Sequence, residues 1–147
     1  MNDPQPRLET CDDLLHGEMK LFQRAGGFRY SVDALLLAAF ALPLSAGARV
    51  LDLGTGSGVV ALILARRGRP ARVVGVELQA GLADIARRNA SANPTDPRVE
   101  IIEADALARP FPAASFDLVV SNPPFQPGGA GPKTRTPNAP SPATKSP

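Results

Sequence analysis

A glycine-rich stretch preceded by an acidic residue lies in the middle of the chain. The run Asp-Leu-Gly-Thr-Gly-Ser-Gly occupies residues 52–58, between two apolar runs. Glycines at such a turn allow a ligand to approach the backbone closely. The spacing is Gly-x-Gly-x-Gly rather than the dinucleotide pattern Gly-x-Gly-x-x-Gly, and a carboxylate at Asp52 suits a ligand with an ammonium group better than a pyrophosphate. We therefore expect the sulfonium cofactor S-adenosylmethionine rather than NAD, with a glycine turn that binds nothing as the alternative.

Two further acidic residues are candidates to bind the rest of such a cofactor. Glu77 ends a predicted strand 19 residues after Gly58, where a carboxylate can accept hydrogen bonds from both ribose hydroxyls. Asp105 follows the next predicted strand and could accept a hydrogen bond from the adenine amine. The alternative for each residue is a solvated charge at the end of a strand.

The most specific motif is Asn-Pro-Pro-Phe at residues 122–125. The two prolines restrict the backbone, so the Asn122 side-chain oxygen and the Pro123 carbonyl can serve as two fixed acceptors. A planar NH2 group offers two donors, and accepting both would free the nitrogen lone pair to attack the sulfonium methyl. Phe125 would stack on the planar acceptor. The motif therefore predicts methylation of a planar amino nitrogen; the alternative is a proline turn with Phe125 in the core.

Strand and helix patterns alternate around these motifs, which favours parallel βαβ units. Predicted helices are Val59–Arg67, with Gly68 as its C-cap, and Ala80–Ala92. The predicted strands are Val50–Leu53, Arg72–Val76, Val99–Glu103 and Phe116–Val120. The unbroken apolar run of the fourth strand suits a strand that is covered on both faces.

The expected sheet order is 3-2-1-4, and right-handed crossovers then place the reversal of direction between strands one and four. The glycine loop leaves strand one and the Asn-Pro-Pro-Phe loop leaves strand four. We therefore expect the cofactor and the acceptor to meet in one crevice.

The remaining segments are a predicted N-terminal hairpin, a helix and two flexible ends. Leu14-Leu15 and Met19–Phe22 would pair across Gly17, and a helix would run from its N-cap Ser31 until Pro43. Residues 1–9 are expected to be flexible, and residues 10–125 to form one α/β domain. Residues 126–147 contain six Pro, three Gly and no aliphatic residue larger than Ala, so they are expected to be disordered.

Composition excludes several other classes of protein. No apolar stretch approaches the ~20 residues that a membrane span requires, and no signal pattern precedes the domain, so a cytoplasmic protein is expected. A single Cys and a single His predict neither a disulfide nor a metal site. The pI of 9.1 says little about nucleic acid, because residues 1–125 carry 13 basic and 14 acidic side chains while residues 126–147 carry three basic and none acidic.

These motifs resemble the bacterial tRNA1(Val) (adenine-37-N6)-methyltransferases, a branch of the class I small-domain methyltransferases. The resemblance covers about residues 10–130, and its matching stretches are residues 13–17, 27–38, 50–58, 75–77, 103–105 and 121–125. It implies a Rossmann-like fold, S-adenosylmethionine as cofactor and, as substrate, an adenine flipped out of a tRNA loop. Guanine-N2 rRNA methyltransferases and release-factor glutamine methyltransferases share the final motif, so these acceptors stay open as alternatives.

The resemblance also assigns roles to individual residues. The residues assigned to the cofactor are Asp52, Gly54, Thr55, Gly56, Gly58, Glu77, Asp105 and Ala106. The residues assigned to the acceptor amine are Asn122, Pro123, Pro124 and Phe125. Arg29 and Tyr30 would border the active site, and packing within their loop is the alternative role.

Family members continue with three further strands beyond the Asn-Pro-Pro-Phe loop, and no such strands are predicted here. The strand at 116–120 would then be an apolar edge, which soluble proteins normally cover or charge. A second hypothesis follows, in which the chain is a truncated cofactor-binding product or a noncatalytic module. In either case we expect self-association, or a partner chain, at residues 116–120.

Overall fold

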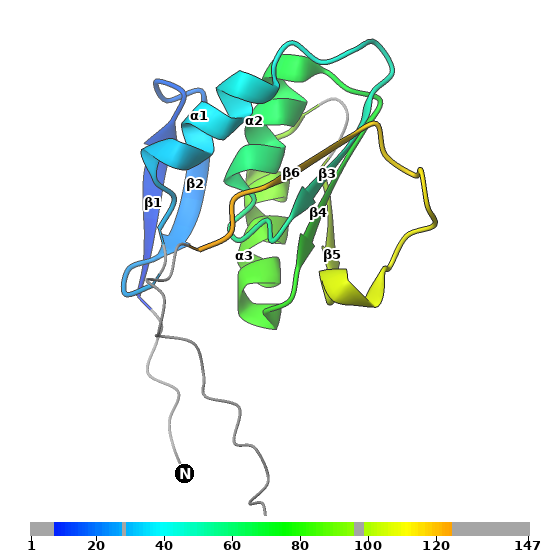
Figure 1. The fold of residues 1–147 in the computed structure, drawn as a ribbon. Coiled ribbons are helices and arrows are strands. Elements are labelled where there is room, and N and C mark those ends of the chain that lie inside the picture. Colours follow the sequence, from blue (N-terminus) through cyan, green and yellow to red (C-terminus); the bar gives the residue numbers. More distant parts are fainter. Residues whose placement is uncertain (1–7, 28, 96–98, 125–147) are drawn as a thin grey trace, which may run out of the picture.

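The computed structural model describes residues 8–27, 29–95 and 99–124 (Figure 1). Its elements, in chain order, are β1 (Glu9–Leu14), β2 (Met19–Arg24), α1 (Val32–Ala41), β3 (Arg49–Leu53), α2 (Val59–Gly68), β4 (Arg72–Glu77), α3 (Ala80–Ala92), β5 (Val99–Glu103), the 3-10 turn η1 (Ala106–Ala108) and β6 (Leu118–Ser121). Phe125 and the tail at 126–147, for which stacking and disorder were expected, lie outside the described residues.

The four strands β5, β4, β3 and β6 form a parallel sheet in that order. This is the predicted order 3-2-1-4, and the predicted α/β fold is confirmed. β3 pairs with both β4 and β6, so Asp52 lies opposite Gly75 on one side and Val120 on the other. The loops that follow β3 and β6 therefore start at the same edge of the sheet.

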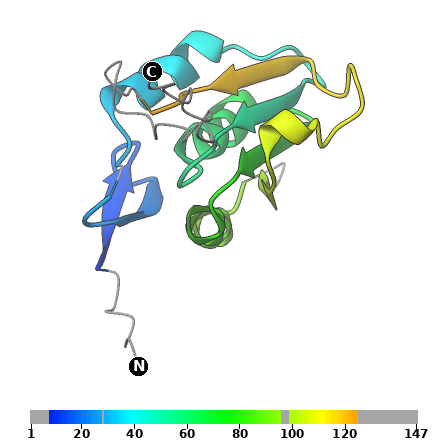
Figure 2. The same ribbon diagram turned by 60° about the horizontal axis from the view of Figure 1, so that its bottom comes forward.

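All three helices lie on one side of this sheet (Figures 1 and 2). The crossovers β3-α2-β4 and β4-α3-β5 step in the same direction, so right-handed connections put both helices on the same face. Residues 59–65 of α2 are all buried, and they pack in one core with Val50, Val73, Val99 and Val120 of the four strands. Helix α1 joins this core through the fully buried Ala34 and Ala38.

The opposite face of the sheet is covered only in part by described residues. Phe111 and Phe116, from the connection between β5 and β6, pack over Leu51, Val74 and Val76, with their two rings edge to face at 4.9 Å. Val119 of β6 is nevertheless 52% exposed. The prediction that the fourth strand is covered on both faces is therefore wrong, because the connection contains only the short turn η1 and does not reach over β6. The strand also begins at Leu118 rather than Phe116.

The N-terminal hairpin is confirmed, with longer strands than predicted. β1 and β2 pair from Glu9 opposite Arg24 to Leu14 opposite Met19, so β1 begins at the last residue of the segment expected to be flexible. The connecting turn holds Gly17 at φ 82°, as expected. Met19 and Leu21 are buried in the main core, which fixes the hairpin to the rest of the fold.

The helix ends follow the predicted caps with one exception. The Ser31 hydroxyl accepts a hydrogen bond from the Asp33 amide at 3.3 Å, as expected for an N-cap. Gly68, predicted to be the C-cap of α2, is instead its last helical residue, and Arg69 adopts the left-handed conformation at φ 46°. Leu44 packs against the bare Cα of Gly68, where any Cβ would collide with it. Packing rather than backbone conformation therefore explains this glycine.

No helix within the described ranges is long and apolar enough to cross a membrane.

Candidate functional site

The glycine loop connects the central strand β3 to helix α2 in a conformation that L-residues rarely adopt. Gly54, Gly56 and Gly58 have φ angles of 67°, 59° and 87°, all in the left-handed region that glycine occupies without a Cβ penalty. The loop is fixed by backbone hydrogen bonds from Thr55 N to the Val76 carbonyl and from Gly58 N to the Thr55 carbonyl, both at 2.9 Å. It therefore forms a rigid backbone surface at the start of α2.

Gly75 lies directly beneath this loop, and none of the sequence motifs assigned a role to this residue. A Cβ at this position would come within 2.8–2.9 Å of the Thr55 side chain, closer than real Cβ contacts. The glycine in β4 thus permits the close approach of strand and loop. The sequence carried two signals: a glycine inside a predicted strand, which typically marks such an approach, and the family resemblance over residues 75–77.

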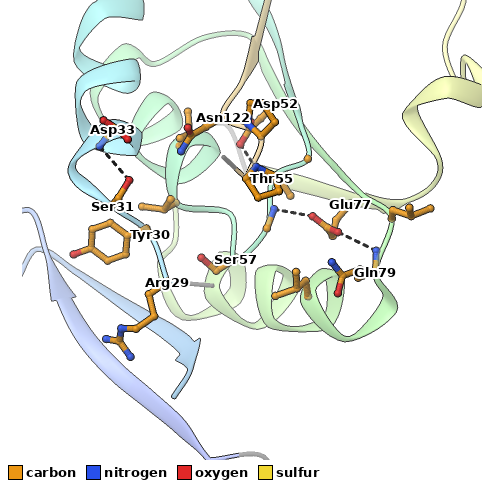
Figure 3. Close-up of a pocket in the computed structure, with 18 residues that line it drawn as sticks. Arg29, Tyr30, Ser31, Asp33, Asp52, Thr55, Ser57, Glu77, Gln79 and Asn122 are labelled. Carbon is orange, nitrogen blue, oxygen red and sulfur yellow. Dashed lines mark hydrogen bonds between the residues drawn. The ribbon is translucent and has the colours of Figure 1, made fainter. Parts of the chain in front are cut away.

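Asp52 is a buried carboxyl group at the carboxyl end of β3. It is 2% exposed, and its Oδ2 accepts a hydrogen bond from the Thr55 hydroxyl at 2.7 Å (Figure 3). Burial raises the pKa of the Asp52 carboxyl to about 6, against smaller opposing effects of the Thr55 hydroxyl and the Ala61 amide. A nearby positive charge would stabilise the ionised form, so the site is suited to a cationic ligand.

Glu77, at the carboxyl end of β4, has both carboxylate oxygens anchored by the backbone. Its Oε2 accepts from the Gly56 amide and its Oε1 from the Gln79 amide, each at 2.9 Å (Figure 3). A carboxylate can accept about four hydrogen bonds. The two oxygens are thus held in place with acceptor capacity left for a pair of ligand hydroxyls.

The Asn-Pro-Pro segment leaves the carboxyl end of β6. The Ser121 hydroxyl donates to the Leu53 carbonyl at 3.0 Å, which ties the start of this segment to the end of β3. Asn122, Pro123 and Pro124 are exposed and line the same cavity as the glycine loop.

The glycine loop, Asp52, Glu77 and the Asn-Pro-Pro segment all line one cavity of about 780 Å³ (Figure 3). This volume is within the range of small-molecule and cofactor sites. The residues that line it are Arg29, Tyr30, Ser31, Asp33, Asp52, Gly54, Thr55, Gly56, Ser57, Val59, Val60, Glu77, Leu78, Gln79, Leu82, Asn122, Pro123 and Pro124. The structure thus brings together the two motifs that the topology predicted to share a crevice.

Asp105 and Ala106 are not among the residues that line this cavity. Asp105 is exposed and caps η1, where its Oδ1 accepts from the Leu107 amide at 2.9 Å. Gly58, the N-cap of α2, is also outside the lining set, and a Cβ there would contact Ala86 of α3.

Several lining residues were missed by the motif analysis. Leu78 is the clearest, because it is 67% exposed at the cavity although it is a large apolar residue. An apolar side chain immediately after the strand-ending Glu77 was the signal that could have revealed it. Gln79 and Leu82 follow it in the same segment and carried no comparable signal.

The wall of the cavity next to α1 is fixed by the hairpin. The Arg29 guanidinium donates to the Thr10 hydroxyl at 2.7 Å and forms an ion pair with Asp12. The buried Gln23 side chain donates to Asp12 at 2.6 Å and accepts from the Tyr30 amide at 2.9 Å. Arg29 and Tyr30 therefore line the cavity, as expected, and both are held there by contacts with the hairpin.

No group of three or more His, Cys, Asp or Glu side chains within the described ranges could hold a metal ion.

The sheet is parallel, a glycine loop follows its central strand β3, and an acidic residue, Glu77, ends the neighbouring strand β4. This arrangement defines a nucleotide-type site of the Rossmann-like class. Comparison with known families is more specific, since the methyltransferase domain family matches residues 50–127, more than half of the chain. The chain therefore belongs to the methyltransferase domain family.

Curated relatives include enzymes with two different acceptors. A release factor glutamine methyltransferase of Chlorobaculum tepidum is 46% identical over 94 residues, which are 62% of this chain and 32% of the relative. A tRNA1(Val) (adenine(37)-N6)-methyltransferase of Aeromonas salmonicida is 42% identical over 110 residues, or 74% of this chain and 44% of the relative. The chain thus spans less than half the length of these relatives.

Similar solved structures support the same fold. The Pyrococcus abyssi tRNA (uracil-54, C5)-methyltransferase, solved with S-adenosyl-L-homocysteine, matches with a TM-score of 0.61 at 26% identity, over 79% of this chain and 28% of that chain. TrmN from Thermus thermophilus matches with a TM-score of 0.52 at 35% identity, over 62% of this chain and 27% of that one.

Proposed function

We propose that this chain is an S-adenosylmethionine-dependent N-methyltransferase whose acceptor is a planar exocyclic amine, with adenine N6 of tRNA as the substrate. One observation carries the proposal: a single cavity is lined both by the glycine loop with Asp52 and Glu77 and by Asn122-Pro123-Pro124. The relatives named as tRNA adenine-N6 methyltransferases support the choice of acceptor. A tRNA substrate would place the activity in the cytoplasm.

The residues of the cavity fit this cofactor. Asp52 offers a buried carboxylate for the ammonium group, and Glu77 offers two backbone-anchored oxygens for the ribose hydroxyls. The left-handed glycines leave the loop open to close contact with the amino-acid part of the cofactor. When bound, S-adenosylmethionine supplies an activated methyl group. Asp105 and Ala106 remain candidates for the adenine end on the basis of the family resemblance alone.

The acceptor half of the reaction depends on the segment after β6. The Asn122 side-chain oxygen and the Pro123 carbonyl would accept hydrogen bonds from the two N–H groups of the amine, so that the nitrogen lone pair would point toward the methyl group. Transfer would form the new N–C bond as the S–CH3 bond of the cofactor breaks, with S-adenosylhomocysteine as the leaving group. The nitrogen would lose its proton to water only after this bond has formed, so no strong base would be needed. Phe125, the next residue, stacks on the acceptor plane in this proposal.

A second acceptor has one specific observation in its favour. The release factor glutamine methyltransferase of Chlorobaculum tepidum is the most identical of the relatives described above. A glutamine side-chain amide is also a planar NH2 group, and the same two acceptors would bind it. Guanine N2 of rRNA fits the same geometry.

Isothermal titration of the purified chain with S-adenosylhomocysteine tests the cofactor, and labelled methyl transfer tests the acceptor. The proposal would be supported by binding of the probe and by methylation of unmodified tRNA, provided that this methylation is lost when the target adenosine is replaced.

The variant Asn122→Ala should keep cofactor binding and lose methyl transfer. Methylation of release factor or rRNA instead would select an alternative acceptor, and binding without any transfer would favour the noncatalytic module. Absence of binding would overturn the proposal.

We also propose that β6 contacts another chain, either a second copy or a partner. β6 is the outermost of the described strands on its side of the sheet, and its Val119 is 52% exposed. An apolar strand at a sheet edge is a template for pairing.

A further inference from the structure

We propose that Asn89 is a positioning residue that couples the N-terminal hairpin to the glycine loop, so that docking of the hairpin and binding in the cavity support each other. Asn89 lies on α3, is fully buried and does not line the cavity. The coupling itself rests on the contacts described below. Its effect on the cofactor rests in addition on the proposed function.

On one side, Asn89 fixes the last peptide of the glycine loop. Its Nδ2 donates to the Ser57 carbonyl at 2.8 Å. The other end of the same peptide is held by the hydrogen bond from Gly58 N to the Thr55 carbonyl. A peptide unit is planar, so bonds at both its C=O and its N–H determine its orientation. Asn89 thereby controls the part of the loop where Ser57 lines the cavity.

On the other side, Asn89 binds the hairpin as a neighbouring strand would. Its Oδ1 accepts from the Phe22 amide at 2.7 Å, and its Nδ2 also donates to the Phe22 carbonyl at 3.0 Å. The next residue of β2, Gln23, accepts from the Tyr30 amide at 2.9 Å. One buried side chain thus connects the glycine loop on one side of the cavity to the hairpin that holds the Tyr30 wall.

The chain contains a matched control for this role. Asn93, one helical turn later, binds the amide and the carbonyl of Lys20 in the same way. Its remaining contact is the Asn89 carbonyl on its own helix, at 2.8 Å. Asn93 therefore holds the hairpin without contacting the glycine loop, and a comparison of the two residues separates hairpin docking from loop positioning.

The first test needs no ligand. Asn89→Leu and Asn93→Leu each replace an amide with an apolar side chain of similar size, and hydrogen exchange is then followed at the Gly58 amide. The global stabilities of the two variants are first made equal with denaturant. Under these conditions, we expect hydrogen exchange at the Gly58 amide to be at least about fivefold faster in Asn89→Leu than in Asn93→Leu. Equal Gly58 exchange in the two folded variants would overturn the coupling.

The second test measures the effect on the cavity with S-adenosylhomocysteine as the probe. We expect the Kd to rise about three- to tenfold in Asn89→Leu, as for the loss of one hydrogen bond, and to stay within about twofold in Asn93→Leu. Equal Kd values would overturn the effect on binding. If the wild-type chain does not bind the probe, the proposed function fails, while the Gly58 exchange still decides the coupling.

If Asn89→Leu does not fold, the wild-type chain provides the answer. Saturation with S-adenosylhomocysteine should slow exchange at the Phe22 amide, which Asn89 holds, more than at the Lys20 amide, which Asn93 holds. Equal slowing at the two amides would contradict the proposal.

Discussion

The two buried acids of the cavity differ in the groups that hold them. Asp52 is bound by the Thr55 hydroxyl, and burial is the main influence on its pKa. Glu77 is bound by two backbone amides that belong to the loop and to the start of α3. The sequence placed both acids correctly at strand ends, but it could not show that neighbouring residues of one loop, Thr55 and Gly56, bind the two carboxyl groups. The contact between Gly56 and Glu77 depends on how β3 and β4 lie side by side.

The raised pKa of Asp52 predicts a dependence on pH. With a folded pKa of about 6 against an ordinary 3.8, the folded chain binds more protons than the unfolded chain between these values. The contribution of Asp52 to the free energy of unfolding therefore falls as pH rises from about 4 to 6, by roughly 3 kcal/mol at most, and is constant above that range. Urea unfolding of wild type and Asp52→Asn across pH 4–7 measures the difference.

The same ionisation should govern binding of a cationic ligand. We expect the Kd for S-adenosylhomocysteine to decrease as pH rises through about 6 and then to level off, because the ammonium group prefers the ionised carboxyl. Asp52→Asn should bind more weakly, with a Kd that is flat over this range. A wild-type Kd that is constant from pH 5 to 7 in calorimetric titrations would contradict the assignment.

Glu77 allows a test with a closely matched control. Glu103 pairs with Glu77 across the β4–β5 register but is exposed and does not line the cavity. We expect Glu77→Gln to raise the Kd for S-adenosylhomocysteine about 10- to 100-fold, since hydrogen bonds to a charged group are lost. Glu103→Gln should leave the Kd within about twofold. Similar Kd increases in both variants would indicate a general effect of charge.

At the scale of elements, Gly75 determines how closely β4 approaches the glycine loop. Gly75→Ala would place a methyl group against Thr55, so we expect a loss of about 1–3 kcal/mol in the free energy of unfolding and weaker binding in the cavity. Gly26→Ala is the control, because its added methyl group meets nothing within 4 Å. Urea unfolding of the two variants checks the difference, and equal stabilities would contradict the assigned role of Gly75.

The elements themselves were largely predictable, because strand and helix periodicity is a local property of the sequence. The hairpin, the Ser31 cap and the strand order all follow from local patterns and from the handedness of crossovers. The errors have tertiary causes. Gly68 was assigned a cap because glycine is common there, whereas contact with Leu44 explains it. The sequence did not indicate that Asp105 caps η1 and lies outside the residues that line the cavity, and its role toward the cofactor stays a prediction.

At the scale of the whole molecule, the two faces of the sheet differ in how completely the described residues cover them. Helices cover one face (Figure 2), while Val119, opposite Leu51 of β3, remains exposed on the other. If β6 associates with another chain, the Val119→Lys variant should be more monomeric than the wild-type chain, because a charge at a strand edge opposes pairing. Light scattering over a range of concentrations measures this shift. A wild-type chain that stays monomeric at every concentration, with no partner recovered, would contradict the proposal.

The position of β6 has one more consequence, which concerns strand register. β6 hydrogen-bonds only to β3 among the described strands, and the glycine loop and the Asn-Pro-Pro segment leave these two strands side by side. A slip of two residues would move Asn122 by about 6.6 Å while every helix stayed in place. At the far end of the pair, Arg49 binds the Asp117 carboxylate through its amide at 2.8 Å and through its guanidinium, and the Asp117 amide donates back to the Arg49 carbonyl at 2.8 Å. Arg49 and Asp117, at the amino ends of β3 and β6, thus fix the register of the two strands. Under the proposed function, this register would set the distance between the methyl donor and the acceptor nitrogen at the carboxyl ends.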